Sequence, residues 1–271
     1  MSKTASIKPK IKTPVSYYGG KQMMLKYILP LIPKHDLYVE PFCGGAAVFW
    51  AKAPVRNEVI NDLNGEVANF YKVLKSDFKN LLKLVKSTLH SRRDYEDAMV
   101  VYKNPHLFTD LKRAWAFWVA TSQSFASSIG GGWSYDRGVK NTRATSVHYK
   151  REGFLDLYEQ RLSRVSIENR SAIKVIEGRN VENAFFYCDP PYHNADQGHY
   201  AGYKESDFID LLEVLSKVKG KFLLSSYPSD VLKSYAEKHG WHQKSIKKTV
   251  SVTLHKKKKV EVLTANYDIN G

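Results

Sequence analysis

The chain has 271 residues, of which 43% are hydrophobic and 25% are charged, as in ordinary globular proteins. No apolar run approaches the roughly 20 residues that cross a bilayer, and the N-terminus lacks a secretory apolar segment, so we expect a soluble, intracellular protein without a membrane partner. Cys43 and Cys188 are the only cysteines, which argues against a disulfide framework and against a cysteine-rich metal site.

Positive charge is the first functional signal. Lys and Arg number 42 against 27 acidic residues, giving a formal net charge of +15. A surplus of this size favours polyanions, of which nucleic acid is the commonest in a cell, although solubility alone would also explain it. Residues 1–13 are expected to form a flexible basic arm, and Lys256–Lys259 form the densest basic run.

Predicted strands and helices alternate along the chain. Strand patterns cover residues 36–42, 58–64, 164–169, 183–192 and 221–227. Helical patterns cover 46–53, about 65–74, 205–220 with Gly220 as C-cap, and 229–240. Residues 245–254 and 258–268 alternate with period two and predict a closing hairpin. We therefore predict an α/β fold with a largely parallel sheet and an antiparallel hairpin at its end.

One interval breaks this rhythm. Roughly ninety residues separate the second and third strands, far more than a crossover helix needs. We predict that residues 76–162 form an inserted, mainly helical subdomain with Trp115, Phe117 and Trp118 in its core. Residues 14–75 and 163–271 would then form the α/β domain.

Acidic residues and a Gly-rich turn lie at the predicted strand ends. Glu40 precedes the turn 41–45, Asp62 follows the second strand and Asp189 follows the fourth. Ligands of open α/β sheets bind at the carboxyl ends of strands, and an acidic residue after the second strand is placed to bind ribose hydroxyls. The pattern predicts an adenosine-bearing cofactor. The turn is not the G-x-G-x-x-G of dinucleotide binding, which disfavours a nicotinamide oxidoreductase.

Several motifs occur together in one order. They read "SYYGGKQMMLKYILPLIP" (16–33), "YVEPFCGGAAVF" (38–49), "VINDLN" (59–64) and "YCDPPY" (187–192), followed by "KFLLSSY" and "KKKKVEVLTANYD". This arrangement resembles the Dam-like DNA adenine-N6 methyltransferases. The resemblance implies a Rossmann-like class I methyltransferase sheet, in which the insertion is a target-recognition subdomain. It also implies S-adenosyl-L-methionine as cofactor, S-adenosyl-L-homocysteine as product and no metal.

The resemblance also implies roles for single residues. Asp189, Pro190, Pro191 and Tyr192 would be the catalytic tetrad. Cofactor-binding residues would be Tyr17, Gly20, Lys21, Glu40, Pro41, Phe42, Gly44, Gly45, Asp62 and Asp189. As alternatives, Lys21 could be a solvated charge at a helix start and Asp62 an N-cap. Two positions depart from the family pattern: Ala46 replaces a turn glycine, so we expect the turn to depend on Gly44 and Gly45, and Ser171 stands where an acidic residue is common.

The tetrad suits methylation of an exocyclic amine. The adenine N6 lone pair is delocalised into the ring, and methyl transfer makes this nitrogen transiently cationic. The Asp189 carboxylate and the Pro190 carbonyl can accept the amine hydrogens and stabilise the developing charge. The prolines stiffen the loop, and Tyr192 offers a face on which the base stacks. Because the target atom is buried in duplex DNA, the base must be flipped out, and residues 193–203 either close over it or form an ordinary surface loop.

DNA recognition is predicted for the Gly-rich, basic stretch of the insertion. Trp133, Tyr135, Arg137, Lys140 and Arg143 suit a hairpin that enters the major groove, although a structural loop touching only phosphates is an alternative. We therefore expect a site-specific, adenine-specific DNA methyltransferase acting on double-stranded DNA in the cytoplasm of a bacterium or a phage host. It would belong to a restriction-modification system or act alone, and its oligomeric state is left open. Alternatives are methylation of another amine (RNA adenine, cytosine N4 or protein glutamine) and a DNA-binding relative with weakened catalysis.

Overall fold

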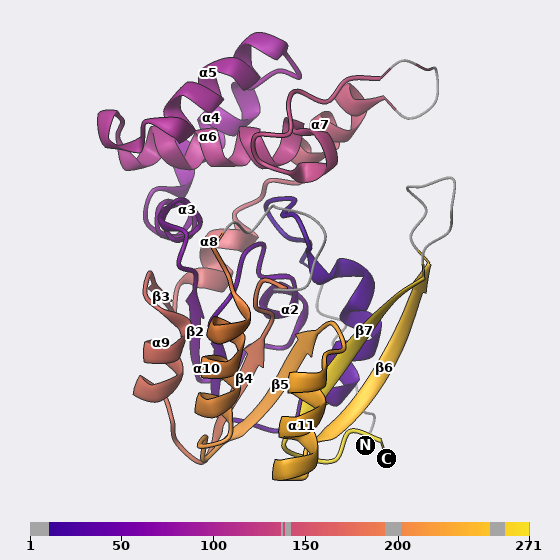
Figure 1. The fold of residues 1–271 in the computed structure, drawn as a ribbon. Helices are drawn as coiled ribbons and strands as arrows, with labels where there is room; N and C mark the ends of the chain where they lie inside the picture. Colours follow the sequence, from indigo (N-terminus) through magenta and orange to yellow (C-terminus); the bar gives the residue numbers. More distant parts are fainter. Residues whose placement is uncertain (1–10, 137, 139–141, 193–201, 250–257, 271) are drawn as a thin grey trace, which may run out of the picture. The chain divides into compact units, whose positions relative to one another are not determined.

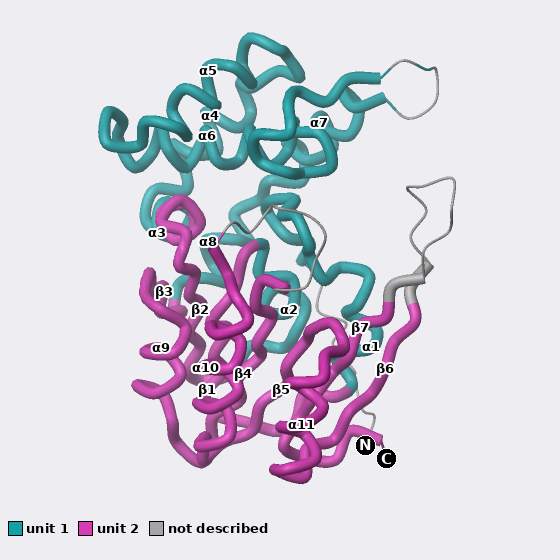
Figure 2. The backbone as a smooth tube through the Cα atoms, in the orientation of Figure 1, with its two compact units in different colours: residues 1–30, 45–54, 72–163 teal, residues 31–44, 55–71, 164–271 magenta. Residues whose placement is uncertain are grey.

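Two compact units make up the described chain. The computed structural model describes residues 11–136, 138, 142–192, 202–249 and 258–270. One unit, here called the helical unit, comprises the described residues up to Pro30 together with residues 45–54 and 72–163 (Figure 2). The other, the sheet unit, comprises the described residues of 31–44, 55–71 and 164–271. Each unit is thus assembled from segments that lie far apart in the sequence.

The sheet unit contains, within the described residues, a seven-stranded sheet of order β3-β2-β1-β4-β5-β7-β6 (Figure 1). Its strands are β1 (Leu37–Glu40), β2 (Asn57–Asn61), β3 (Val165–Glu168), β4 (Ala184–Cys188), β5 (Lys221–Ser226), β6 (His242–Thr249) and β7 (Lys258–Ala265). β3, β2, β1, β4 and β5 pair in parallel, whereas β7 pairs antiparallel with both β5 and β6. The predicted parallel sheet with a closing antiparallel hairpin is confirmed.

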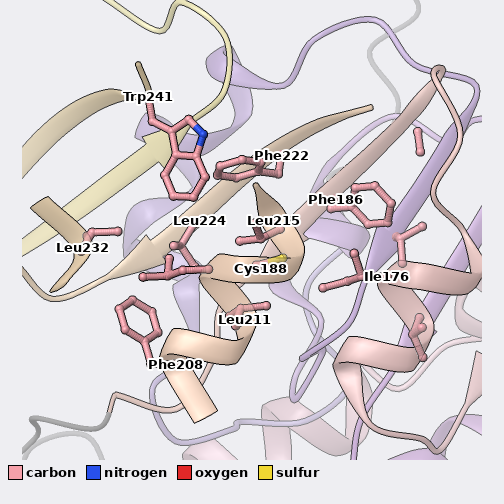
Figure 3. Close-up of a cluster of buried hydrophobic side chains, with 14 of the residues drawn as sticks. Ile176, Phe186, Cys188, Phe208, Leu211, Leu215, Phe222, Leu224, Leu232 and Trp241 are labelled. Atoms are coloured by element: carbon pink, nitrogen blue, oxygen red, sulfur yellow. The ribbon is translucent and has the colours of Figure 1, made fainter. Parts of the chain in front are cut away.

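Three helices cover one face of this sheet. They are α9 (Ala172–Gly178), α10 (Glu205–Leu215) and α11 (Asp230–His239), and their apolar residues pack with alternate residues of the strands. Figure 3 shows Phe208 and Leu211 of α10 in this cluster with Phe186 and Leu224 of the strands. Because strand side chains alternate between faces, Tyr187, Ser225 and Glu261, which neighbour the cluster residues Phe186, Leu224 and Val262, lie on the opposite face.

The helical unit is built around α6 (Asp110–Gln123), in which residues 114–121 are all buried. Its main helices are α2 (Ala47–Ala51), α4 (Phe78–Ser87), α5 (Arg92–Lys103), α6 (Asp110–Gln123), α7 (Arg143–Glu152) and α8 (Leu157–Leu162). Shorter helices are η1 (Lys21–Met24), α1 (Leu25–Ile28), η3 (Pro105–Leu107) and η4 (Phe125–Ser127), while η2 (Leu29–Leu31) and α3 (Gly65–Ser76) run across the boundaries of the units. Trp115, Phe117 and Trp118 of α6 are buried, which confirms their predicted place in the core.

Several predicted boundaries were wrong. The strands predicted over 58–64 and 183–192 end earlier, at Asn61 and Cys188. α10 ends at Leu215, with Ser216 as C-cap, and not at Gly220. Gly220 is needed for another reason: a Cβ there would lie 2.3 Å from the carbonyl oxygen of Ala184. β6 begins at His242, three residues before the predicted start, because its antiparallel pairing with β7 extends back to His242 opposite Ala265, shortly after the C-cap of α11 at Gly240, which has φ 64°. Residues 250–254 of the predicted strand lie outside the described residues.

Candidate functional site

The strand order reverses between β1 and β4. β1 pairs with β2 on one side and with β4 on the other. The connection from β1 leads to β2 and that from β4 leads to β5, so the two connections run toward opposite edges of the sheet. Ligands of open α/β sheets bind beyond the carboxyl ends of the strands at such a reversal. Glu40 is the last residue of β1, and Asp189 directly follows β4. The fold therefore brings two of the predicted site carboxylates to the edge of the sheet where a ligand is expected.

The Asp-Pro-Pro-Tyr segment is anchored through its tyrosine. The Tyr192 hydroxyl lies 3.1 Å from Oε1 of Glu261 and 3.4 Å from Oδ1 of Asp189. Ser225 Oγ donates to the same Glu261 oxygen at 2.5 Å. The rings of Tyr192 and Tyr227 are 4.3 Å apart. Asp189 and Tyr192 are partly exposed and Pro190 is buried, so the two polar side chains of the tetrad lie partly exposed just after the end of β4.

Glu40 is buried at the end of β1. Only 2% of the residue is exposed, and its Oε2 accepts the Tyr38 hydroxyl at 2.6 Å. Burial, followed by the charge of Glu40 and the hydrogen bond to it, raises the pKa of Tyr38 well above its ordinary value. Tyr38 therefore remains a neutral donor that orients the Glu40 carboxylate.

The turn after β1 uses left-handed backbone at two positions. Gly44 has φ 45° and Ala46 has φ 51°, whereas Gly45 does not have a positive φ. The expectation that Gly44 and Gly45 would supply the turn was therefore half wrong: Ala46 adopts the strained conformation itself, at a cost of about 1–3 kcal/mol. Gly45 is required for space, because a Cβ there would lie 3.1 Å from Tyr17 Cβ.

Asp62 ties the turn to the end of β2. One carboxylate oxygen accepts the Gly44 amide at 2.8 Å, and the other accepts the Asn64 amide at 2.9 Å. Asn64, and not Asp62, accepts the Glu66 amide in the first turn of α3, so the N-cap alternative for Asp62 was wrong. Burial raises the pKa of Asp62, although the amides of Asn64 and Gly44 act in the opposite direction. Each oxygen keeps a further lone pair for a hydroxyl donor.

Asn61, a residue that the sequence did not single out, connects three loops at this edge. Its side-chain amide donates to the carbonyls of Pro41 at 2.8 Å and Arg170 at 3.0 Å. Its carbonyl oxygen accepts the Arg170 amide at 2.9 Å. Ser171, the next residue, is the N-cap of α9 but forms no side-chain cap hydrogen bond. A buried asparagine at the end of an apolar strand was the sequence signal for this connection.

In the helical unit, the Gly-Gly-Lys motif forms a tight local structure. The Gly20 amide donates to the Tyr17 carbonyl at 3.1 Å, and a Cβ on Gly20 would lie 3.0 Å from the same oxygen. Lys21 begins η1, is only 6% exposed and donates to the Gly19 carbonyl at 3.3 Å. The alternative that Lys21 is a solvated charge was therefore wrong. A buried ammonium next to two glycines is chemically suited to a ligand carboxylate.

The predicted DNA-reading residues are only partly described. Arg137 and Lys140 lie outside the described residues, as do residues 193–201 of the predicted closing loop. Arg143 is exposed at the start of α7. Trp133 stacks with His90, at 4.9 Å between ring centroids, and with Tyr135, at 5.7 Å. Its indole nitrogen donates to Gln123 Oε1 at 3.2 Å, so Trp133 also stabilises the loop.

Arg92, at the start of α5, adds a cation to this aromatic stack. Its guanidinium carbon lies 4.8 Å from the Trp133 ring centroid and 5.8 Å from that of Tyr135. Arg92 is exposed, and no carboxylate pairs with it in the part of the chain that the structure describes. Sequence reasoning missed Arg92 because forty residues separate it from the aromatic loop.

The described residues also bear on metal binding, membrane crossing and cysteine reactivity. They contain no group of three or more His, Cys, Asp or Glu placed to hold a metal ion. None of the described helices is both long enough and apolar enough to cross a membrane. Cys43 and Cys188 are free and buried, and burial raises the pKa of both thiols, so neither is a ready nucleophile.

Comparisons with known proteins point to one family. The chain is 26% identical over 232 residues to the type II methyltransferase M1.LlaDCHI of Lactococcus lactis subsp. cremoris, which covers 79% of this chain and 80% of that protein. It is 34% identical over 101 residues to the DNA N-6-adenine-methyltransferase of Escherichia phage P1, covering 36% of this chain and 13% of that protein. A match to the modification methylase StsI of Streptococcus sanguinis is 33% identical over 75 residues and covers 27% of this chain and 11% of that protein.

The chain thus spans most of one of these relatives and a small part of the other two. A family model described as the D12 class N6 adenine-specific DNA methyltransferase matches residues 17–263. This range includes both the Gly-Gly-Lys motif and the Asp-Pro-Pro-Tyr segment. The chain therefore belongs to the D12 class of N6 adenine-specific DNA methyltransferases.

Proposed function

We propose that this protein transfers a methyl group from S-adenosyl-L-methionine to the exocyclic N6 of an adenine in double-stranded DNA. The observation that carries the proposal is the Asp-Pro-Pro-Tyr segment at the carboxyl end of β4, beside β1 at the reversal of strand order. Membership of the D12 class supports the same reaction.

The described residues suit the cofactor chemically. Asp62 is partly buried, holds its turn with one hydrogen bond per oxygen and has acceptor capacity left for ribose hydroxyls. Lys21 is a buried cation suited to the methionine carboxylate, with Tyr17 and Gly20 beside it. Glu40, Pro41, Phe42, Gly44 and Gly45 would complete the cofactor-binding residues. When bound, the cofactor supplies an activated methyl group on its sulfonium.

The reaction depends on acceptors at the end of β4. In our proposal, Asp189 and the Pro190 carbonyl accept the two amine hydrogens of a flipped adenine and direct the N6 lone pair at the methyl group. As the nitrogen becomes cationic, the fixed Asp189 carboxylate stabilises it, and the extra proton is then lost to solvent. Tyr192 stacks on the base and offsets part of the few kcal/mol that flipping costs.

The helical unit supplies the proposed DNA contacts. We assign this role to Trp133, Tyr135, Arg137, Lys140 and Arg143, and we add Arg92. The Arg92 guanidinium lies over the Trp133 and Tyr135 rings and is exposed, so its N–H groups can reach phosphate or guanine. Trp133 would act mainly by holding Arg92 and the loop in place. The DNA that the protein modifies would lie in the cytoplasm of a bacterium or a phage host.

The proposal is tested by offering the protein tritiated S-adenosyl-L-methionine with duplex DNA, RNA and protein acceptors. We expect label in the duplex DNA only, and at least about 100-fold less label with Asp189→Ala, the size of effect expected when a charge-stabilising group is removed. Label in RNA or protein only would favour the alternative amine substrates. Sequence-specific DNA binding without any transfer would favour a relative that has lost catalysis.

A further inference from the structure

A buried carboxylate on the closing hairpin contacts the catalytic tetrad. Glu261 of β7 is 3% exposed, and its Oε1 accepts two hydroxyl groups, from Ser225 of β5 and from Tyr192. These residues all belong to the sheet unit, and Ser225 and Glu261 lie on the sheet face opposite the α9–α10–α11 cluster. A buried carboxyl oxygen that accepts from two hydroxyl groups, one of them at 2.5 Å, is held in place by them.

The Tyr192 hydroxyl has one proton and a choice of acceptors. Glu261 Oε1 is 3.1 Å away and Asp189 Oδ1 is 3.4 Å away, while Ser225 Oγ lies at 3.5 Å. The shortest of these distances assigns the proton to Glu261. This arrangement reduces the competition of Tyr192 for the Asp189 oxygen that the substrate amine needs. It also fixes the Tyr192 ring, which is further held by the Tyr227 ring at 4.3 Å.

We propose that Glu261 is a positioning residue for methyl transfer, acting through the Tyr192 hydroxyl and supported by Ser225. Glu261 sets the plane of the Tyr192 ring on which the flipped base stacks, and it keeps the hydroxyl proton away from Asp189. This inference rests on the proposed function, because it assigns Glu261 to the same reaction. Glu261 itself makes no contact with the reacting atoms in this scheme.

The test is a double-mutant cycle between Glu261→Met and Tyr192→Phe, with both the rate constant of a single turnover and the KM for the cofactor measured. Methionine keeps the volume and removes both acceptors. We expect each single variant to lower the rate about 10-fold, the upper end of the effect of losing one hydrogen bond, with the KM changed less than about twofold. The double variant should be no slower than the worse single variant, because both remove the same interaction. Glu261→Gln, which keeps an acceptor for Tyr192, should recover most of the rate.

A second measurement is independent of methyl transfer. In a duplex with 2-aminopurine at the target position, we expect Glu261→Met to reduce the fluorescence increase that accompanies base flipping. Thr264→Val is the matched control. It removes a buried hydroxyl of the same strand, β7, which accepts a hydrogen bond from Gln243, and it should leave both the rate and the fluorescence increase unchanged. Thermal melting of every variant checks folding. If Glu261→Met does not fold, Ser225→Ala and Tyr192→Phe complete the cycle, with the same non-additivity expected.

The outcomes separate the two proposals. A wild-type protein that transfers no methyl group contradicts the proposed function. An active wild type with a folded Glu261→Met variant of unchanged rate contradicts only the role of Glu261. Rate losses that multiply in the double variant would also overturn that role, because they would show that Glu261 acts independently of the Tyr192 hydroxyl.

Discussion

The carboxylate of Asp62 accepts the backbone amide of Gly44 at 2.8 Å, although eighteen positions separate the two residues along the chain. This hydrogen bond joins the turn after β1 to the end of β2, next to the reversal of strand order. The acidic side chain proposed to bind the cofactor ribose therefore also holds the turn along which the cofactor would lie. A substitution of Asp62 should therefore weaken cofactor binding more than it slows the chemical step at Asp189.

The first prediction concerns pH and Asp62. Burial raises the pKa of Asp62, so as pH falls this carboxyl is protonated before an ordinary aspartate and loses acceptor capacity for ribose hydroxyls. Affinity for S-adenosyl-L-homocysteine should therefore decrease as pH falls through that raised pKa. Asp62→Asn should bind the product at least about 10-fold more weakly at neutral pH, with little further pH dependence. Calorimetric titration measures both, and a wild-type affinity that is as insensitive to pH as the variant would contradict the assignment.

A second prediction contrasts Ala46 with Gly45. Ala46 has φ 51°, a conformation that glycine adopts without the steric cost. A glycine also raises the conformational entropy of the unfolded chain, which opposes this gain. Ala46→Gly should therefore leave the free energy of unfolding unchanged or raise it by up to about 1 kcal/mol. Gly45→Ala places a Cβ 3.1 Å from Tyr17 Cβ and should destabilise by about 1–3 kcal/mol. Urea unfolding of the two variants distinguishes conformational strain from lack of space. Equal effects in the same direction would show that the turn differs from the one described.

Lys150 provides a third prediction, on stability. This residue of α7 donates to the Ser122 carbonyl at 3.3 Å, and burial, with a smaller contribution from the charge of Arg143, lowers its pKa to about 8. At pH values between about 8 and 10.5, the ordinary pKa of lysine, Lys150 is protonated in the unfolded chain and largely deprotonated in the folded chain. The free energy of unfolding should therefore rise with pH across this interval. The gain should be at most about 3 kcal/mol. Lys150→Met should abolish this rise, which urea titrations at several pH values would measure; an equal rise in the variant would contradict it.

Arg92 leads to a fourth prediction, on DNA binding. Arg92→Ala should weaken binding and reduce the steep decrease of affinity with salt that phosphate contacts cause. Arg92→Lys keeps the charge but loses the planar group that stacks on Trp133, so it should restore the salt dependence and not the sequence preference. Arg93→Ala is a matched control, because Arg93 is exposed and pairs with Asp97 at 3.1 Å. If Arg92→Ala and Arg93→Ala have equal effects on specificity, the aromatic stack does not orient a DNA contact.

The strands, and the place of the Asp-Pro-Pro-Tyr segment at the end of β4, could be predicted because their signals are local. β1, β4 and β5 are short apolar runs, and each ends in polar or turn residues, so pattern alone placed them. Gly220 misled the prediction for α10, because a glycine after a helix usually marks its C-cap, whereas here it allows a close approach to Ala184.

The contacts between distant segments could not be predicted in the same way. Tyr192 and Glu261 are 69 positions apart, and their hydrogen bond depends on the antiparallel register of β5 and β7. The sequence signal for Glu261 was weak, because Glu261 is a single acidic residue in a strand and is followed and preceded by valines. The burial of Lys21 likewise depends on packing that no local pattern encodes.

Identification of the methylated nucleoside tests the central claim most directly. Duplex DNA is incubated with the protein and S-adenosyl-L-methionine, digested to nucleosides and analysed by mass spectrometry. We predict N6-methyldeoxyadenosine with the wild-type protein and at least about 100-fold less with a folded Asp189→Ala variant. N4-methyldeoxycytidine in its place, or an unchanged yield from Asp189→Ala, would contradict the account.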